Sequence, residues 1–338
     1  MLPRSMLLTA ALLLFLYFSP LLRSGVTWIT WQLAAAIGAL SILTYALPYL
    51  VVSILPPQNL KKKYDADWAF VTGSSSGIGR ALAERLALQG VNIVLVALDD
   101  QLLKDTHAAL TNQFPQLKFR AVGADLSVSD GSYMTAIAQA TKDIHVSLVF
   151  NNAGYMVTGF FRQVPLNKHL ANIECNTVSA VRITHHFFQR MVDSKRKGAI
   201  VFTSSVAGYI PSPFATGYGA TKAFLSSFAA SLAVEARHYG VDICAVHPSP
   251  VNSRFLDKAD KLDSLEFTSQ FAYRPEDLPD DIFRTVGRAV WRDLGGFALV
   301  ARGVTKLIDY NALATIFSLT AHNMKDWKMA TQRSGPKS

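Results

Sequence analysis

The sequence predicts an α/β protein in which a doubly wound parallel sheet is preceded by N-terminal transmembrane helices. Short apolar runs typical of buried strands alternate with helical stretches from residue 68 onward. The first of these runs leads directly into a glycine-rich turn and a helix. About 55 almost uncharged residues come before it. At 338 residues, the chain is long enough for one large α/β domain and an added apolar segment.

The N-terminal segment consists of two uncharged runs, residues 5–22 and residues 24–60, separated by Arg23. A spanning helix needs about 20 apolar residues, so we expect two spans joined by a tight turn at residues 23–25. A single span is the alternative, as is a cleaved signal peptide for the first run. Lys61-Lys62-Lys63 follows the second run, which places the catalytic domain on the cytoplasmic side by the positive-inside rule.

Composition argues against several other classes of protein. The net charge is +9, but no basic stripe interleaved with aromatics is present, so we expect no nucleic-acid partner and assign the charge to an anionic membrane surface. Cys175 and Cys244 form no CxxC and no disulfide framework, which fits a reducing compartment. The adjacent His185 and His186 point to different sides of a helix, so we expect no metal site.

A dinucleotide site is predicted where residues 68–72, a buried strand, meet a helix over residues 80–89. Gly73 permits the tight turn, Gly77 lets backbone approach a pyrophosphate, and Gly79 lets the helix approach the strand. The helix N-terminus supplies N–H donors to the phosphates. This context predicts a Rossmann-type fold. The turn residues expected to bind the cofactor are Gly73, Ser75, Ser76, Gly77, Ile78 and Gly79.

Five further strands complete the expected sheet. Ligands of such sheets bind at the carboxyl ends of the strands, where each motif described below falls. The predicted strands span residues 91–97, 118–122, 146–150, 199–203 and 241–246.

Tyr218 and Lys222 lie four residues apart at the start of an apolar helix and therefore share one helix face. Hydride reduction of a carbonyl needs an acid for the oxygen, and the reverse reaction needs a base. A free tyrosine has a pKa of about 10, and lowering it by about three units takes about 4 kcal/mol. One ammonium at about 4 Å supplies that amount at an effective dielectric constant of about 20, so Lys222 is a sufficient perturbant.

Ser205 ends the fifth strand, where its hydroxyl can donate to a substrate oxygen. A Tyr-x-x-x-Lys pair alone is common in helices. It becomes specific when it follows, in order, the glycine turn, the strand end Asn151-Asn152-Ala153-Gly154 and the serine strand end.

In these motifs, from about residue 68 to about residue 253, the chain resembles the short-chain dehydrogenase/reductase superfamily. The resemblance implies that Tyr218 is the acid/base and that Lys222 activates it and binds the ribose. It implies that Ser205, 13 residues before Tyr218 (218 − 205), is the substrate-orienting hydroxyl rather than Ser204. It also implies a water-holding role for Asn176 and cofactor contacts for Asp125, Asn152, Ala153, Gly154, Pro248 and Val251. Without the resemblance, the sequence is equally consistent with Asn176 as a helix-surface amide and with Asp125 as a strand-end cap.

Two segments depart from the family pattern. Residues 247–251 read His-Pro-Ser-Pro-Val where the family usually has Pro-Gly, which leaves the nicotinamide loop with less backbone freedom. The second strand ends in Ala97-Leu98-Asp99-Asp100, which has neither the base that marks NADP nor the acid that marks NAD. Arg80 could reach a 2′-phosphate. NADP(H) is favoured by the resemblance alone, and NAD(H) is the alternative.

Residues 64–69 lead from the apolar segment into the glycine turn and resemble a membrane-anchored branch of the superfamily. This branch contains 17β-hydroxysteroid dehydrogenases and very-long-chain 3-oxoacyl-CoA reductases. The branch implies an endoplasmic reticulum membrane and an apolar lipid substrate, such as a 3-oxoacyl-CoA or a sterol. Reduction of 3-ketosphinganine, a retinoid dehydrogenase and a non-catalytic scaffold for cofactor and lipid are the alternatives. The resemblance also implies a homodimer built on the helices around Asn176 and Tyr218.

The expected organisation is a membrane anchor at 1–60, the catalytic domain at 61–302 and a C-terminal apolar and basic tail at 303–338. The tail is expected to be a membrane-contacting helix or a packed surface helix. Within the domain, residues 254–295 are the expected substrate region, although its apolar side chains also suit a core. These side chains are Phe255, Leu256, Leu262, Leu265, Phe267 and Phe271.

Overall fold

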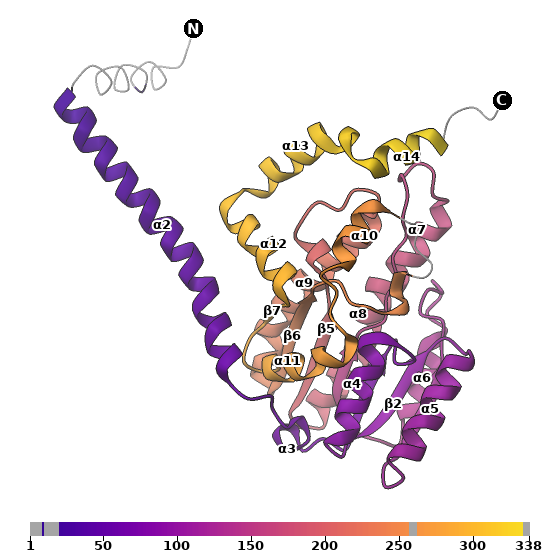
Figure 1. The fold of residues 1–338 in the computed structure, drawn as a ribbon. Helices are drawn as coiled ribbons and strands as arrows, with labels where there is room; N and C mark the ends of the chain where they lie inside the picture. The colour runs from indigo at the N-terminus through magenta and orange to yellow at the C-terminus, as the bar shows by residue number, and fades with distance from the viewer. Residues whose placement is uncertain (1–8, 10–19, 257–261, 334–338) are drawn as a thin grey trace. The chain divides into compact units, whose positions relative to one another are not determined.

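The structure, a computed structural model, describes residue 9, residues 20–256 and residues 262–333 (Figure 1). The chain divides into two compact units, residues 1–51 and residues 52–338. Each unit is described by itself.

The first unit contains most of helix α2, Pro20–Ile54, which is 35 residues long. Residues 23–25 lie inside this helix, so the predicted turn there is wrong. Proline at the first position of a helix has a suitable φ, and glycine inside a helix costs only about 1 kcal/mol, so nothing at residues 20–25 stops the helix. The first predicted span, residues 5–22, lies almost wholly outside the described residues.

Helix α2 ends at Ile54, just before Pro56-Pro57, as the sequence predicts. Its segment Thr27–Ile54 contains an 18-residue stretch with a mean hydropathy of 1.9, and most of its side chains are exposed. Within the described ranges, this is the one helix that is long and apolar enough to cross a membrane.

The second unit contains a parallel sheet of seven described strands in the order β3-β2-β1-β4-β5-β6-β7 (Figure 1). The chain builds outward from β1 in one direction and from β4 in the other, so the topological switch point lies between β1 and β4. The strands are β1 (Trp68–Thr72), β2 (Asn92–Ala97), β3 (Phe119–Gly123), β4 (Val146–Asn151), β5 (Gly198–Thr203), β6 (Val241–Pro248) and β7 (Trp291–Leu294).

The six predicted strands are confirmed, with ends that shift by up to two residues. The sequence analysis misses β7 because this strand reads Trp-Arg-Asp-Leu and has no apolar run. Arg292 and Asp293 are nevertheless buried, which apolar periodicity cannot anticipate.

Helices cover both faces of the sheet because successive strand side chains point to opposite sides. Val71 of β1 belongs to one core with Leu82 and Phe283. Phe70 belongs to the other core, where its ring lies 4.7 Å from that of Phe187. The sheet is therefore buried on both faces, as its apolar strands predict.

The helices on the first face are α4 (Gly77–Leu88), α5 (Gln101–Gln113) and α11 (Leu278–Thr285), with the short α3 (Leu60–Tyr64). Those on the second face are α6 (Tyr133–Thr141), α8 (Ser179–Asp193) and α9 (Thr216–Ala236). The remaining helices are α7 (Leu166–Ile173), α10 (Asp263–Ser269), α12 (Gly296–Leu307), α13 (Tyr310–Thr320) and α14 (Lys325–Arg333). Helix α12 runs continuously across residue 302, where the sequence analysis ends the catalytic domain.

Gly79 should not tolerate a side chain. A Cβ at this position would lie 2.2 Å from the Gly73 carbonyl oxygen, which is backbone and cannot rotate away. We expect Gly79→Ala to cost about 1–3 kcal/mol of stability and to weaken dinucleotide binding, as measured by thermal denaturation and cofactor fluorescence. Gly303→Ala is the matched control, because nothing lies within 4 Å of a Cβ there. An unchanged melting temperature for Gly79→Ala would contradict the expectation.

Candidate active site

The glycine turn lies at the carboxyl end of β1, beside the switch point. Gly73 and Gly77 have φ values of 64° and 56°, which side chains rarely adopt. The Ser74 amide donates to the Val96 carbonyl at 3.2 Å, which fixes the turn against β2. Helix α4 begins at Gly77, so its free N–H groups lie where the sequence analysis expects the phosphates.

Asn152 connects the ends of three strands. Its backbone N–H donates to the Thr72 hydroxyl at 2.9 Å, and its side-chain amide donates to the Thr72 carbonyl at 3.1 Å. The Thr203 hydroxyl donates to its side-chain oxygen at 3.1 Å. The Ala153 amide donates to the same Thr72 hydroxyl. The predicted residues Asn152 and Ala153 thus join the ends of β1, β4 and β5.

Gly154, Asn176 and Lys222 come together although they are far apart in the sequence. A Cβ on Gly154 would lie 3.1 Å from the Asn176 Oδ1 and 3.4 Å from the Lys222 Nζ. Asn176 is buried in a π-helical turn, Glu174–Val178, and exchanges hydrogen bonds of 3.0 Å with the backbone N–H and carbonyl of Tyr155. Such turns occur frequently at functional sites. The surface alternative for Asn176 is therefore wrong.

The Tyr218 phenol lies next to the Ser205 hydroxyl and beside Lys222. Burial raises the pKa of the Tyr218 phenol to about 12, and the hydrogen bond with Ser205 lowers it in part. The pKa is therefore raised, whereas the sequence argument expects Lys222 to lower it. The reason is that the phenol is buried and the ammonium, 5.5 Å from the ring centroid, donates to the Thr203 carbonyl at 2.8 Å.

Lys222 is buried, and burial lowers the pKa of its ammonium to about 8. Its bond to the Thr203 carbonyl aims the ammonium toward the carboxyl ends of β4 and β5. A buried lysine whose pKa lies near neutrality suits proton transfer.

The other predicted cofactor residues lie at the same edge of the sheet and make different contacts. Asp125 accepts from the Ser127 amide and hydroxyl at 2.9 and 2.6 Å, which is the strand-end cap. Pro248 ends β6, and Val251 bridges to Tyr273. Ser75, Ser76 and Ile78 are half-buried in the glycine turn.

The end of β2 carries the residues that would meet the ribose. Leu98 is exposed, and Asp99 packs beside Gly123. Arg80 pairs with Glu84 on its own helix at 2.9 Å. No described residue here distinguishes the two cofactors by a dedicated phosphate contact.

The sequence analysis misses the hydroxyl and amide side chains that hold the site together. Thr72 and Thr203 end strands, and Asn172 donates to the Tyr155 carbonyl at 2.7 Å. Threonine at the end of an otherwise apolar strand is the signal that could have identified the first two.

One aromatic ring packs on Tyr218, and a second group of rings joins α14 to the segments that precede α7 and α9. Phe255, from the predicted substrate region, has its ring centroid 5.6 Å from that of Tyr218. Trp327 of α14 packs against Phe160 and Phe214 at 5.0 and 6.3 Å. The C-terminal helix therefore contributes to this end of the molecule.

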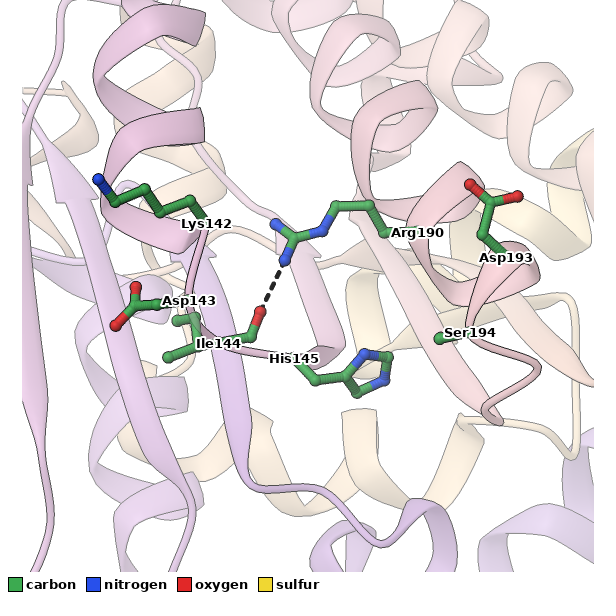
Figure 2. A pocket seen from close by; sticks show the side chains of 7 residues that line it. All are labelled: Lys142, Asp143, Ile144, His145, Arg190, Asp193 and Ser194. Carbon is green, nitrogen blue, oxygen red and sulfur yellow. Dashed lines mark hydrogen bonds between the residues drawn. The ribbon is translucent and has the colours of Figure 1, made fainter.

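A separate pocket lies before the start of β4 and at the end of α8 (Figure 2). Arg190 donates to the Ile144 carbonyl at 2.7 Å across it. Because ligands of open α/β sheets bind at the carboxyl ends of strands, this pocket at an amino end is not the dinucleotide site.

A parallel sheet with a glycine turn at its switch point, with a buried tyrosine and lysine and a half-buried serine at the same edge, defines a nicotinamide-dependent oxidoreductase. A family model described as short chain dehydrogenase matches residues 67–263. The chain belongs to this family, and it is an NAD(P)-dependent enzyme.

Among curated relatives, a very-long-chain 3-oxoacyl-CoA reductase of Mycosarcoma maydis is 30% identical over 76% of this chain and 75% of its own length. A hydroxysteroid dehydrogenase-like protein 1 of Gallus gallus is 34% identical over 63% of this chain and 62% of its own.

Two solved structures show the same fold. A 7beta-hydroxysteroid dehydrogenase, at 24% identity and a TM-score of 0.68, covers 76% of this chain and is itself covered to 99%. A short-chain dehydrogenase from Sphingobium yanoikuyae in complex with NADPH is 28% identical, with a TM-score of 0.60. It covers 71% of this chain and is covered to 96%.

The buried Lys222 ammonium should cost stability. Its pKa falls from an ordinary value of 10.5 to about 8, which corresponds to about 3 kcal/mol below pH 8. Between pH 8 and 10.5 the unfolded chain binds a proton that the folded chain does not, so this cost disappears as the pH rises. We expect Lys222→Met to melt at a higher temperature than the wild type at pH 7, with a difference that shrinks toward pH 10.5.

Lys104→Met, at an exposed position of α5, is the control and should show no such trend. A Lys222→Met difference that is the same at pH 7 and pH 10 would refute the assignment.

Proposed function

We propose that this chain transfers a hydride between a nicotinamide cofactor and the carbonyl or hydroxyl of an apolar lipid, with Tyr218 as the acid/base. The observation that carries the proposal is the buried Tyr218 beside the buried Lys222 and next to Ser205, at the strand edge where the glycine turn lies. Non-catalytic binding would not require this arrangement.

In the reducing direction, the Tyr218 phenol donates its proton to the substrate oxygen as hydride arrives at the carbon. Ser205 donates a hydrogen bond to the same oxygen and fixes its position. Bound cofactor supplies the hydride and, once oxidised, a positive charge that lowers the pKa of the phenol. Lys222 would bind the ribose of the cofactor and pass the proton onward, and Asn176 would hold the water through which that proton leaves.

Tyr218, Lys222, Asn152, Ala153 and Gly154 line the cofactor in this proposal, and the glycine turn holds its pyrophosphate. The cofactor we favour is NADP(H), which is supported by the relative from Sphingobium yanoikuyae that binds NADPH. NAD(H) is the alternative, because Asp99 at the end of β2 disfavours a 2′-phosphate by charge. The relative rates with NADPH and NADH decide between them.

The substrate we propose is a 3-oxoacyl-CoA or a sterol-type lipid. Phe255 lies against Tyr218, and the ring cluster of Phe160, Phe214 and Trp327 lies at the same end of the molecule. Such rings favour an apolar chain or ring system over a sugar. Relatives named for 3-oxoacyl-CoA reduction and for hydroxysteroids support the same classes. A 3-ketosphinganine and a retinoid are alternatives within this chemistry.

Tyr218→Phe should abolish turnover because it removes the transferable proton and leaves the ring. Turnover of 3-oxoacyl-CoA and ketosteroid substrates can be measured by the oxidation of NADPH. We expect kcat to fall by at least about 10³-fold, while the affinity for NADPH stays within threefold. Tyr273→Phe, which loses a hydroxyl that accepts from the Gly296 amide, is the matched control and should remain active. Wild-type protein that oxidises neither NADPH nor NADH with any of these ketones would instead support a non-catalytic scaffold.

We also propose that α2 anchors the enzyme in the endoplasmic reticulum membrane, with the catalytic domain in the cytoplasm. The length and hydropathy of Thr27–Ile54 and the basic run Lys61-Lys62-Lys63 support this arrangement. A cleaved signal sequence is the alternative, because a helix near the N-terminus passes the same test. A homodimer through the helices of Asn176 and Tyr218 stays a prediction.

The consecutive helices α12 and α13 (Figure 1) supply a second membrane contact in this proposal. On α12, the apolar side chains of Val300, Val304 and Leu307 share one exposed face. Helix α13 contains no charged residue and exposes Ile316 and Leu319. An exposed apolar face of this kind is costly in water and is typical of a helix lying in a membrane interface.

The membrane contact can be measured in liposomes that contain spin-labelled lipids. We expect a fluorophore on Leu307→Cys or Leu319→Cys to be quenched by these lipids, whereas one on Leu88→Cys, an exposed position of α4, is not. Cys244 is buried, Cys175 is half-buried, and burial raises the pKa of both thiols to about 12, so they should react slowly with the label.

A label on Leu40→Cys of α2 tests the anchor separately. Quenching at Leu40 alone would reject the contact through α12 and α13 and keep the anchor. Quenching at none of these positions would reject both, and self-quenching between copies at Leu319 would identify this face as a dimer contact instead.

A further inference from the structure

A buried polar network lies behind the catalytic lysine and has no place in the reaction described above. The Ser204 hydroxyl lies 2.7 Å from the Lys222 carbonyl and 2.8 Å from the Ser226 hydroxyl. The Ser226 hydroxyl in turn lies 2.9 Å from the His247 Nε2. Helix α9, which carries Tyr218 and Lys222, is thereby joined to the end of β6.

The network continues from His247 to a buried ion pair. The His247 Nδ1 lies 3.5 Å from an Asp293 carboxylate oxygen, a contact that is not a hydrogen bond among the described residues. Arg302 of α12 donates to both oxygens of this carboxylate, at 2.9 and 3.0 Å. Asp293 is 2% exposed and His247 is 0% exposed. Burial lowers the pKa of His247 to about 4, so its imidazole is neutral near pH 7.

Arg302 has a second contact, with the serine segment. Its guanidinium carbon lies 3.6 Å from the centroid of the Tyr209 ring, which is a stacking distance. Tyr209 directly follows the 3₁₀ turn Val206–Gly208, whose N-cap is Ser205. One guanidinium therefore contacts the segment of Ser205 directly and the helix of Lys222 through Asp293, His247 and Ser226.

The indole of Trp291 in β7 strengthens the second of these connections. Its Nε1 donates to the Ser226 carbonyl at 2.8 Å, and its ring packs edge-on against His247 at 5.6 Å. Ser226 is thus held through both its hydroxyl and its carbonyl, one helical turn after Lys222.

Burying Asp293 and Arg302 costs several kcal/mol of hydration for each ion, and apolar residues of similar size would often serve stability as well. The pair adds a fixed geometry, because a bidentate arginine–carboxylate contact sets the relative orientation of the two side chains as well as the distance between them. His247 lies between this ion pair and α9: it touches Asp293 through its Nδ1 and hydrogen-bonds Ser226 through its Nε2.

We propose that Arg302, Asp293 and His247 are positioning residues that hold the Ser205 segment and the Tyr218–Lys222 helix at a fixed separation. The inference rests on the proposed function for the roles of the residues being positioned. It assigns α12 a share in catalysis, although none of its residues needs to touch the reacting atoms.

The test removes both charges together, so that no unpaired ion is left in the interior. We expect the double variant Asp293→Leu/Arg302→Met to fold with a melting temperature close to that of the wild type. Its kcat should fall by about tenfold or more, because small displacements of catalytic groups are costly, while KM and NADPH affinity change less than twofold. The single variant Arg302→Lys keeps the positive charge but lacks the planar guanidinium. It should recover less than half of the kcat that Asp293→Leu/Arg302→Met loses.

Arg120→Met/Asp143→Leu is the matched control, because Arg120 also pairs with its carboxylate through two bonds and stacks on an aromatic ring, that of Trp68. It should leave kcat unchanged. A kcat for Asp293→Leu/Arg302→Met within twofold of the wild type would overturn the proposal, as would full recovery by lysine.

Amide hydrogen exchange provides a readout that does not depend on turnover. Peptides covering residues 204–209 and 218–226 should exchange faster in Asp293→Leu/Arg302→Met than in the wild type or in the Arg120 control. If the wild type reduces no ketone, the proposed function fails, and this measurement still decides the positioning role. Unchanged exchange in both peptides would overturn it.

Discussion

The bond from the Lys222 ammonium to the Thr203 carbonyl is the interaction on which the rest of the site depends. It joins the catalytic helix to the end of β5 through a charge that burial penalises. The close packing of Gly154 and Asn176 around the same ammonium leaves it little freedom to move. A buried cation held in this way keeps a fixed position relative to the sheet, and Tyr218 takes its position from the same helix.

The strand ends provide the frame for this interaction. Because all the described strand pairings are parallel, Thr72, Asn152 and Thr203 arrive at one edge and bond to one another there. Backbone and hydroxyl groups that would otherwise lack partners satisfy each other at this edge. The hydrogen bonds that hold the strand ends together therefore also hold the site together.

Much of this could be predicted from the sequence, because the relevant signals are local. The strands of the sheet interior are apolar runs, and the glycine turn and the Tyr218–Lys222 spacing are short patterns. β7 could not be predicted because its buried Arg292 and Asp293 oppose the apolar rule, and apolar periodicity does not reveal the side chains that pair with them, Ser53 and Arg302. The expectation that Lys222 lowers the pKa of Tyr218 fails because it considers only the charge of the lysine. The burial of the phenol, which raises its pKa, is left out.

The position of Trp327 has a consequence for how such enzymes diversify. Trp327 lies more than a hundred residues after Lys222 and yet packs on Phe160 and Phe214, close to the reacting end of the sheet. The glycine turn follows β1, the first strand of the sheet, whereas Trp327 belongs to α14. Under the proposed function, replacements in α14 would therefore change which molecule is accepted without altering the glycine turn or the Tyr218–Lys222 pair.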